Sequence, residues 1–311
     1  MKKLKCVVAV PGDSLYLREQ TGAAKAAADR LGIEVDVVNA GMDSVGQSQQ
    51  ILNFIQGPVD SRPDAILIEP VSAAGLPRVA EAAVAAGIAW VVSNAQVEYI
   101  PELRATAKAP VFLVSQDHVE IGRIEGRQMG ALLPDGGTVL YLRGPSMSNV
   151  ATARHQGVLD GVPKKVEVKN LKVQGSSSEN AFTTVASWLA LSTVRPEGTQ
   201  IVASQNADFI FGAKKSFESN TQEPDRSKWL AIPCLGVGVP SQTKPLVDQG
   251  VLRAAVLTSV TMDTAIEILA RALKDVKQPP EHTIVPAYSY PTLEELTAKP
   301  IKRAPASPAK T

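Results

Sequence analysis

Two stretches of the chain share one pattern: residues 7–32, VVAVPGDSLYLREQTGAAKAAADRLG, and residues 139–162, VLYLRGPSMSNVATARHQGVLDGV. Each begins with a short apolar run, continues through a polar loop and ends in a segment with helical spacing. Gly22 and Gly157 fall at comparable points of the two stretches. A buried strand followed by a loop and a helix is the unit of an α/β fold. Its recurrence later in the chain predicts two lobes of this kind.

The same alternation of apolar runs and helical patterns continues through most of the 311 residues. The apolar runs are continuous, which is typical of parallel strands that helices cover on both faces. Gly32, Gly87 and Gly250 each follow a helical pattern, where a left-handed cap is expected. We predict strands at 5–10, 34–38, 65–68, 89–93, 111–115, 138–142, 166–171, 201–203, 231–237, 252–257 and 283–288, and helices at 18–31, 48–55, 76–86, 122–133, 152–159, 181–191, 210–218 and 262–276.

The predicted fold class is α/β: two doubly wound, parallel-sheet (Rossmann-like) lobes joined by a three-strand hinge, with a ligand cleft between them. We expect residues 1–115 and 259–280 to form the N-terminal lobe and residues 116–258 and 281–297 the C-terminal lobe. Residues 298–311 are rich in Pro, Ala and Lys, and we expect a disordered basic tail there. Without that tail the net charge of +1 becomes about −3.

Composition excludes several classes of protein. With 32 Lys and Arg against 31 Asp and Glu, the chain has no excess charge that would favour a nucleic-acid partner. No apolar stretch reaches the roughly 20 residues of a membrane span, and the apolar run at 6–10 is too short for a signal peptide. We expect Cys6 and Cys234 to be buried strand residues without a disulfide, and no Cys or His spacing indicates a metal site.

The motifs of common enzyme classes are missing. There is no GxxxxGK(S/T) and no HExxH, and Gly236-Val-Gly238 lacks the third glycine of a dinucleotide loop. The segment 144–148 lacks the second glycine of a nucleophile elbow. The histidines at 118, 155 and 282 are far apart in sequence, and no nucleophile is paired with a base. We therefore expect a protein without catalytic residues, cofactor or metal.

Polar residues directly follow seven of the predicted strands. Taken singly, Asp13, Ser72 and Asp208 are better explained as helix caps. Taken together the loops predict a crevice rich in hydrogen-bonding groups, because the carboxyl ends of parallel strands meet at one edge of a sheet. Amide, hydroxyl and carboxylate groups of this kind suit a hydroxylated solute. Tyr16 is interpreted equally well as a ring that lies against the solute or as a packing residue. Arg154 is interpreted equally well as a cation in the cleft or as part of a surface ion pair.

Seven further segments matter through their order and spacing: 9–17 (AVPGDSLYL), 62–72 (RPDAILIEPVS), 114–117 (VSQD), 153–157 (ARHQG), 204–206 (SQN), 235–238 (LGVG) and 247–255 (VDQGVLRAA). Together they resemble the type I periplasmic solute-binding proteins, the ribose-binding-like branch that shares its fold with the effector domains of LacI-type repressors. The resemblance runs from about residue 4 to residue 290.

The resemblance implies a periplasmic protein, a monomer, that binds a sugar or polyol and delivers it to an ABC permease or reports it to a membrane receptor. Sugar binders of this family carry Asp-Arg where this chain has Asn94-Ala95, and an Asp where it has Gly238. A less common polyol, a modified sugar and another small polar metabolite therefore all stay open. The ligand-binding residues that the resemblance implies are Asp13, Tyr16, Asn94, Asp117, Arg154, Asn206 and Thr258.

Three functions compete on this sequence. The first is a binding protein whose lobes close on a small hydroxylated solute for ABC import. The second is a ligand-sensing module for a receptor or regulator, although no helix-turn-helix motif precedes Lys5 and a DNA-binding repressor is disfavoured. The third is an enzyme on a doubly wound scaffold, which the missing motifs make the weakest of the three.

Overall fold

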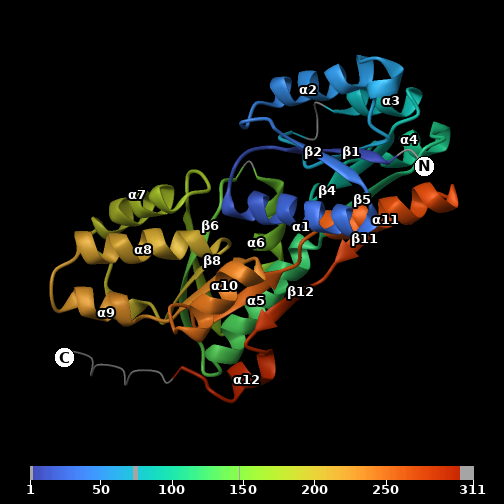
Figure 1. The fold of residues 1–311 in the computed structure, drawn as a ribbon. Helices are drawn as coiled ribbons and strands as arrows, with labels where there is room; N and C mark the ends of the chain where they lie inside the picture. The colour runs from blue at the N-terminus through green and yellow to red at the C-terminus, as the bar shows by residue number, and fades with distance from the viewer. Residues whose placement is uncertain (1–2, 73–75, 147, 302–311) are drawn as a thin grey trace, which may run out of the picture. The chain divides into compact units, whose positions relative to one another are not determined.

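The computed structural model describes residues 3–72, 76–146 and 148–301. It divides into two compact units, unit 1 with residues Met1–Gln116 and Ser259–Val285 and unit 2 with residues Asp117–Thr258 and Pro286–Thr311. In each unit a six-stranded sheet lies between layers of helices (Figure 1). The predicted α/β fold class, with two doubly wound sheets, is confirmed.

Unit 1 contains a sheet of six parallel strands in the order β11-β5-β4-β3-β1-β2. One buried apolar cluster lies between the sheet and helices α1 and α11, and a second lies under helices α2, α3 and α4. Its elements are β1 (Lys5–Val10), α1 (Leu15–Leu31), β2 (Glu34–Asn39), α2 (Ser44–Gln56), η1 (Val59–Ser61), β3 (Ala65–Ile68), α3 (Pro77–Ala85), β4 (Ala89–Ser93), α4 (Ile100–Thr106), β5 (Val111–Gln116), α11 (Met262–Asp275) and β11 (His282–Val285).

Unit 2 repeats this arrangement with the strand order β12-β10-β9-β8-β6-β7, in which only β12 runs antiparallel to its neighbour among the pairs of the described residues. In both sheets the first strand lies between the second and the third, so the winding direction switches beside it. The elements of unit 2 are α5 (His118–Leu132), β6 (Gly137–Arg143), α6 (Asn149–Gly161), β7 (Val166–Lys172), α7 (Ser178–Leu189), η3 (Pro196–Gly198), β8 (Ile201–Ser204), α8 (Ala207–Asn220), α9 (Asp225–Ala231), β9 (Cys234–Gly238), α10 (Pro240–Asp248), β10 (Ala254–Thr258), β12 (Ala287–Tyr290) and α12 (Leu293–Thr297).

The structure differs from the expected lobe boundaries near residue 281. A single strand was expected at 283–288, but β11 pairs with β5 in unit 1 and β12 pairs with β10 in unit 2. Residues 281–285 therefore belong to unit 1, not to the C-terminal lobe. Pro286 separates the two strands, and because proline has no N–H it cannot continue a ladder of backbone hydrogen bonds.

The expected tail also differs at its beginning. The backbone N–H of Ile301 donates to the carbonyl of Leu132 over 2.9 Å, and the Ile301 side chain packs against an apolar cluster of unit 2. Residues 298–301 are thus held against α5, whereas a disordered segment was expected from residue 298. The rest of that expected tail, 302–311, lies outside the described residues.

Several local expectations are confirmed. Gly32, Gly87 and Gly250 have φ angles of 71°, 77° and 74°, as left-handed caps require. Cys6 and Cys234 are buried free thiols on β1 and β9. Within the described residues, no helix combines the length and the hydropathy needed to cross a bilayer.

Helices α5 and α6 of unit 2 pack with their backbones in contact. A Cβ atom on Gly157 would lie 1.9 Å from the carbonyl oxygen of Val119, and one on Gly122 would lie 1.9 Å from the carbonyl oxygen of Arg154. Only glycine allows this approach. The contact fixes the first two turns of α5 beside the second and third turns of α6, and Arg154 lies close enough to His118 for its charge to lower the histidine pKa.

Candidate functional site

The carboxyl edge of the unit 1 sheet carries a half-buried polar pair, Glu69 after β3 and Asn94 after β4. The Asn94 amide Nδ2 donates to Glu69 Oε1 over 3.2 Å. Asn94 adopts a left-handed backbone with φ of 53°, which asparagine tolerates better than most residues. Burial raises the pKa of Glu69 to about 7, although the hydrogen bond from Asn94 opposes that shift. At neutral pH this carboxyl is therefore able both to donate and to accept hydrogen bonds.

Buried glutamines hold the loops around this pair. Gln47, which is 1% exposed, donates through Nε2 to the carbonyl of Glu69 and accepts at Oε1 from the N–H of Val71. Gln20 accepts at Oε1 from the backbone N–H and the hydroxyl of Thr261, whose hydroxyl is also 2.7 Å from Ser93 Oγ. The loop after β3 and the segment that leads into α11 are thus fixed by side-chain hydrogen bonds, which the sequence does not predict.

The loop after β1 holds two more of the expected residues. Asp13 is exposed and binds Arg18 through both carboxylate oxygens, at 2.7 and 2.8 Å. This contact lowers the pKa of Asp13, first through the hydrogen bonds from Arg18. The cap of α1 is Ser14, not Asp13. The half-buried ring of Tyr16 packs against the apolar cluster under α1, which agrees with its interpretation as a packing residue.

In unit 2, Gln205 joins the loops after β6 and β8. Its Oε1 accepts from the N–H of Gly144 over 2.9 Å, and its Nε2 donates to the carbonyl of Ala151 over 2.8 Å. Its own carbonyl accepts from Arg154 Nη1 over 2.7 Å. The next residue, Asn206, caps α8 by accepting from the N–H of Asp208. Arg154 and Asn206 are therefore brought to the same edge.

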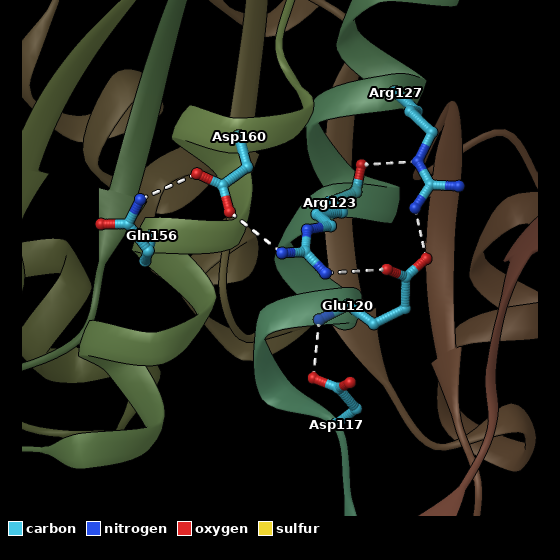
Figure 2. A network of polar contacts seen from close by, with 6 residues as sticks. All are labelled: Asp117, Glu120, Arg123, Arg127, Gln156 and Asp160. Carbon is cyan, nitrogen blue, oxygen red and sulfur yellow. Dashed lines mark hydrogen bonds and ion pairs between the residues drawn. The ribbon is translucent and has the colours of Figure 1, made fainter.

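Asp117 begins α5, where its Oδ1 accepts from the N–H of Glu120 over 2.9 Å (Figure 2). Its side chain thus caps the helix through Oδ1, and the second carboxylate oxygen, Oδ2, takes no part in this cap. Farther along, Arg123 lies 3.6 Å from Glu120 and 3.2 Å from Asp160, and Arg127 also binds Glu120 (Figure 2). These arginines are occupied with surface ion pairs between and along α5 and α6.

Buried titratable groups surround Arg154. The hydroxyl of Tyr141 is 3.2 Å from both carboxyl oxygens of Glu125, and the two side chains are 0% and 3% exposed. Burial raises the pKa of Glu125 to about 8, against the opposing effect of the Arg154 charge. Burial, and then the same charge, lower the pKa of His118 to about 3. At neutral pH Glu125 and His118 are therefore mainly uncharged, and Arg154 is the cation of this group.

The structure places the expected residues at or after the carboxyl ends of strands, and it engages Asp13, Asp117 and Arg154 in hydrogen bonds within the protein. In unit 1, Asp13 and Asn94 follow β1 and β4, which flank β3 in the sheet. In unit 2, Arg154 and Asn206 meet at Gln205, and the buried Thr258 ends β10 two strands away. The sequence pointed to the segments 62–72 and 204–206, but not to Glu69 or Gln205 within them. Within the described residues, no cluster of His, Cys, Asp and Glu could hold a metal ion.

Comparison with known proteins shows which proteins share this architecture. The family model described as "Periplasmic binding protein domain" matches residues 6–277. A search of curated protein sequences finds no match.

Solved structures of solute-binding proteins are similar along nearly the whole chain. A galactofuranose-binding protein is 20% identical, with a TM-score of 0.75 over 95% of this chain and 98% of its own. A periplasmic solute-binding protein of an ABC transporter from Actinobacillus succinogenes 130z, with bound D-allose, is 17% identical, with a TM-score of 0.79 over 95% and 100%. A solute-binding protein of an ABC transporter from Bacillus halodurans C-125, with bound myo-inositol, is 18% identical, with a TM-score of 0.74 over 96% and 98%. At these identities the likeness shows a shared fold.

Proposed function

Because the chain belongs to the periplasmic binding protein domain family, whose members bind solutes without enzymatic turnover, we propose that it captures a small hydroxylated solute, a sugar or polyol, for ABC import or for sensing. The observation that carries this proposal is the unused hydrogen-bonding capacity of Glu69 and Asn94. Glu69 Oε2 and Asn94 Oδ1 are buried, and neither has a partner among the described residues. An unmade hydrogen bond of a buried oxygen is costly, and a solute hydroxyl would supply it.

We assign the solute contacts to both carboxyl edges. Asp13, Tyr16 and Asn94, with Glu69 added, form the half contributed by unit 1. A solute hydroxyl can donate to Asn94 Oδ1, and Tyr16 can offer its ring edge to an apolar C–H face. The half contributed by unit 2 consists of Asp117, Arg154, Asn206 and Thr258.

Support for the solute class comes from the similar structures, whose ligands include D-allose and myo-inositol. The same proposal places the protein in the periplasm as a monomer that passes its solute to an ABC permease or a membrane receptor. A thermal-shift screen of D-allose, L-arabinose, D-galactose, myo-inositol and glycerol, followed by calorimetric titration of each stabilising compound, tests it. A chain that none of these and no further sugar or polyol stabilises would contradict the proposal.

Replacing Arg154 with alanine should weaken binding of the best compound at least about tenfold, because a charge-assisted hydrogen bond contributes roughly 1.5–3 kcal/mol. Arg123→Ala is the matched control, since Arg123 lies on the neighbouring helix and is engaged by Glu120 and Asp160. Calorimetry gives the affinities, and thermal unfolding without ligand shows that both variants are folded. Equal affinities of the two variants would remove Arg154 from the site.

A further inference from the structure

Two cationic residues end neighbouring strands of unit 2. Arg143 is the last residue of β6 and Lys172 the last residue of β7, and the two are direct partners in the parallel ladder. Residues in register on adjacent strands point to the same face of a sheet. That face also carries Tyr141, whose ring stacks on His155 of α6 with centroids 6.3 Å apart.

Within the described part of the chain, neither cation has an acidic side chain as its partner. Across 3–72, 76–146 and 148–301, no hydrogen bond or ion pair joins the side chain of Arg143 or Lys172 to another residue. Like charges directly opposite each other on adjacent strands destabilise a sheet. In addition, Arg143 Nε is buried and has no acceptor among the described residues, an arrangement that costs stability until an acceptor arrives.

The pKa of His155, a third ionisable group nearby, responds to this positive charge. Burial is the largest cause that lowers the pKa of His155, and the positive charges of Arg143 and Lys172 lower it further. No acidic residue occupies the first turn of α6, whose N-terminal dipole lies at the same edge of the sheet. The two cationic side chains and the N-terminus of α6 therefore make this position electropositive.

The two cations belong to the edge that carries the proposed site. The residue after Arg143 is Gly144, whose N–H donates to Gln205 Oε1, and the carbonyl of Gln205 accepts from Arg154. The path from Arg143 to Arg154 thus passes through one buried glutamine. An anionic group held by Arg143 could belong to the same molecule whose hydroxyls meet Arg154 and Asn206.

We propose that the solute carries an anionic substituent, a carboxylate or a phosphate, and that Arg143 and Lys172 bind it. This inference rests on the proposed function and narrows the ligand to an acidic sugar or polyol. The planar guanidinium of Arg143 matches a carboxylate or phosphate through paired N–H donors, and Lys172 adds a point charge. It also agrees with the sequence, which lacks two carboxylates at positions where sugar binders of the resembled family carry them.

Matched pairs of acidic and neutral probes test the proposal by calorimetric titration: D-galacturonate with D-galactose, and D-glucose 6-phosphate with D-glucose. The variants are Arg143→Gln and Lys172→Gln. Lys169→Gln is the control, because Lys169 lies three residues before Lys172 on β7 and so on the opposite face of the sheet. At least one acidic probe should bind about tenfold or more tightly than its neutral parent, a difference of about 1.4 kcal/mol.

Each of the two variants should lower that affinity about tenfold, leave the neutral parent unchanged, and reduce the salt dependence of binding. Lys169→Gln should leave every affinity unchanged. The relative affinities of the carboxylate and phosphate probes then identify the anionic group. Neutral sugars that bind as tightly as their acids would overturn the anion site while the proposed function stands.

Inorganic phosphate provides a readout that needs no sugar. It should raise the midpoint of thermal unfolding of the unmodified protein and of Lys169→Gln by more than that of Arg143→Gln or Lys172→Gln. Equal protection of all four proteins would overturn the anion site even if sugars bind. Phosphate protection that depends on Arg143, together with no binding of any sugar or polyol, would contradict the proposed function and not the anion site.

Discussion

Replacing Gly157 with alanine should destabilise unit 2 by roughly 3 kcal/mol or more, the upper range for overpacking a close contact. The added methyl group would lie 1.9 Å from the carbonyl oxygen of Val119, a backbone atom that cannot rotate away. Helices α5 and α6 would have to separate, and Arg154 would move with α6. Urea unfolding followed by circular dichroism measures the loss, and hydrogen exchange should show it in peptides of unit 2.

Gly22→Ala is the matched control for this prediction. Gly22 also lies inside a helix, but a Cβ atom there would meet nothing within 4 Å. Because alanine favours helix more than glycine does, this variant should gain about 0.5–1 kcal/mol. If Gly157→Ala were as stable as Gly22→Ala, the contact between the helix backbones would not exist as described.

Replacing Glu125 with glutamine should stabilise the protein at neutral and alkaline pH, by roughly 2 kcal/mol at pH 7. The pKa of Glu125 is raised from 4.5 to about 8 in the folded protein. Its carboxyl therefore contributes stability fully below about pH 4.5, and that contribution is lost as the pH rises through about 8. Glutamine can still accept from Tyr141 but cannot ionise. The stability difference between variant and unmodified protein should therefore be small at pH 5 and grow toward pH 8.

The pH series of urea unfolding has its own control in Glu120→Gln. Glu120 lies on the same helix but is partly exposed and paired with Arg123 and Arg127. Its loss should cost less than about 1 kcal/mol, and its pH series gives the slope with which that of Glu125→Gln is compared. If Glu125→Gln left the slope of the unfolding free energy against pH unchanged between pH 6 and pH 9, Glu125 would be ionised in the folded protein. The conclusion that it is buried in its neutral form would then be wrong.

The alternation of strands and helices could be predicted from sequence because apolar runs report burial directly. A comparison of Gly22 with Gly157 shows what such sequence patterns do not predict. The two glycines hold equivalent places in the sequence pattern, but one faces open space and the other touches the backbone of α5. Local sequence does not reveal which helix packs against which. The same holds at Pro286, where one apolar run divides between two sheets.

The candidate site was predictable to the level of loops, not of individual contacts. The rule that ligands bind at the carboxyl ends of parallel strands selected the segments that hold Asn94, Arg154 and Asn206. It could not show that Arg18 engages Asp13, because that pair depends on the side-chain geometry of the first helical turn. Nor could it reveal Glu125, since a glutamate in a helix is usually exposed and only tertiary packing buries it.

Unit 1 is assembled from segments that leave the ribosome at very different times. Its first five strands are complete at Gln116, but its sixth strand, β11, and helix α11 come only after residue 258. Until α11 is made, Gln20 lacks the Thr261 donors and one apolar cluster of unit 1 stays uncovered. Unit 1 therefore cannot finish folding before most of unit 2 has been synthesised. A nascent chain that stops near residue 258 should bind chaperones through the face that α11 would cover.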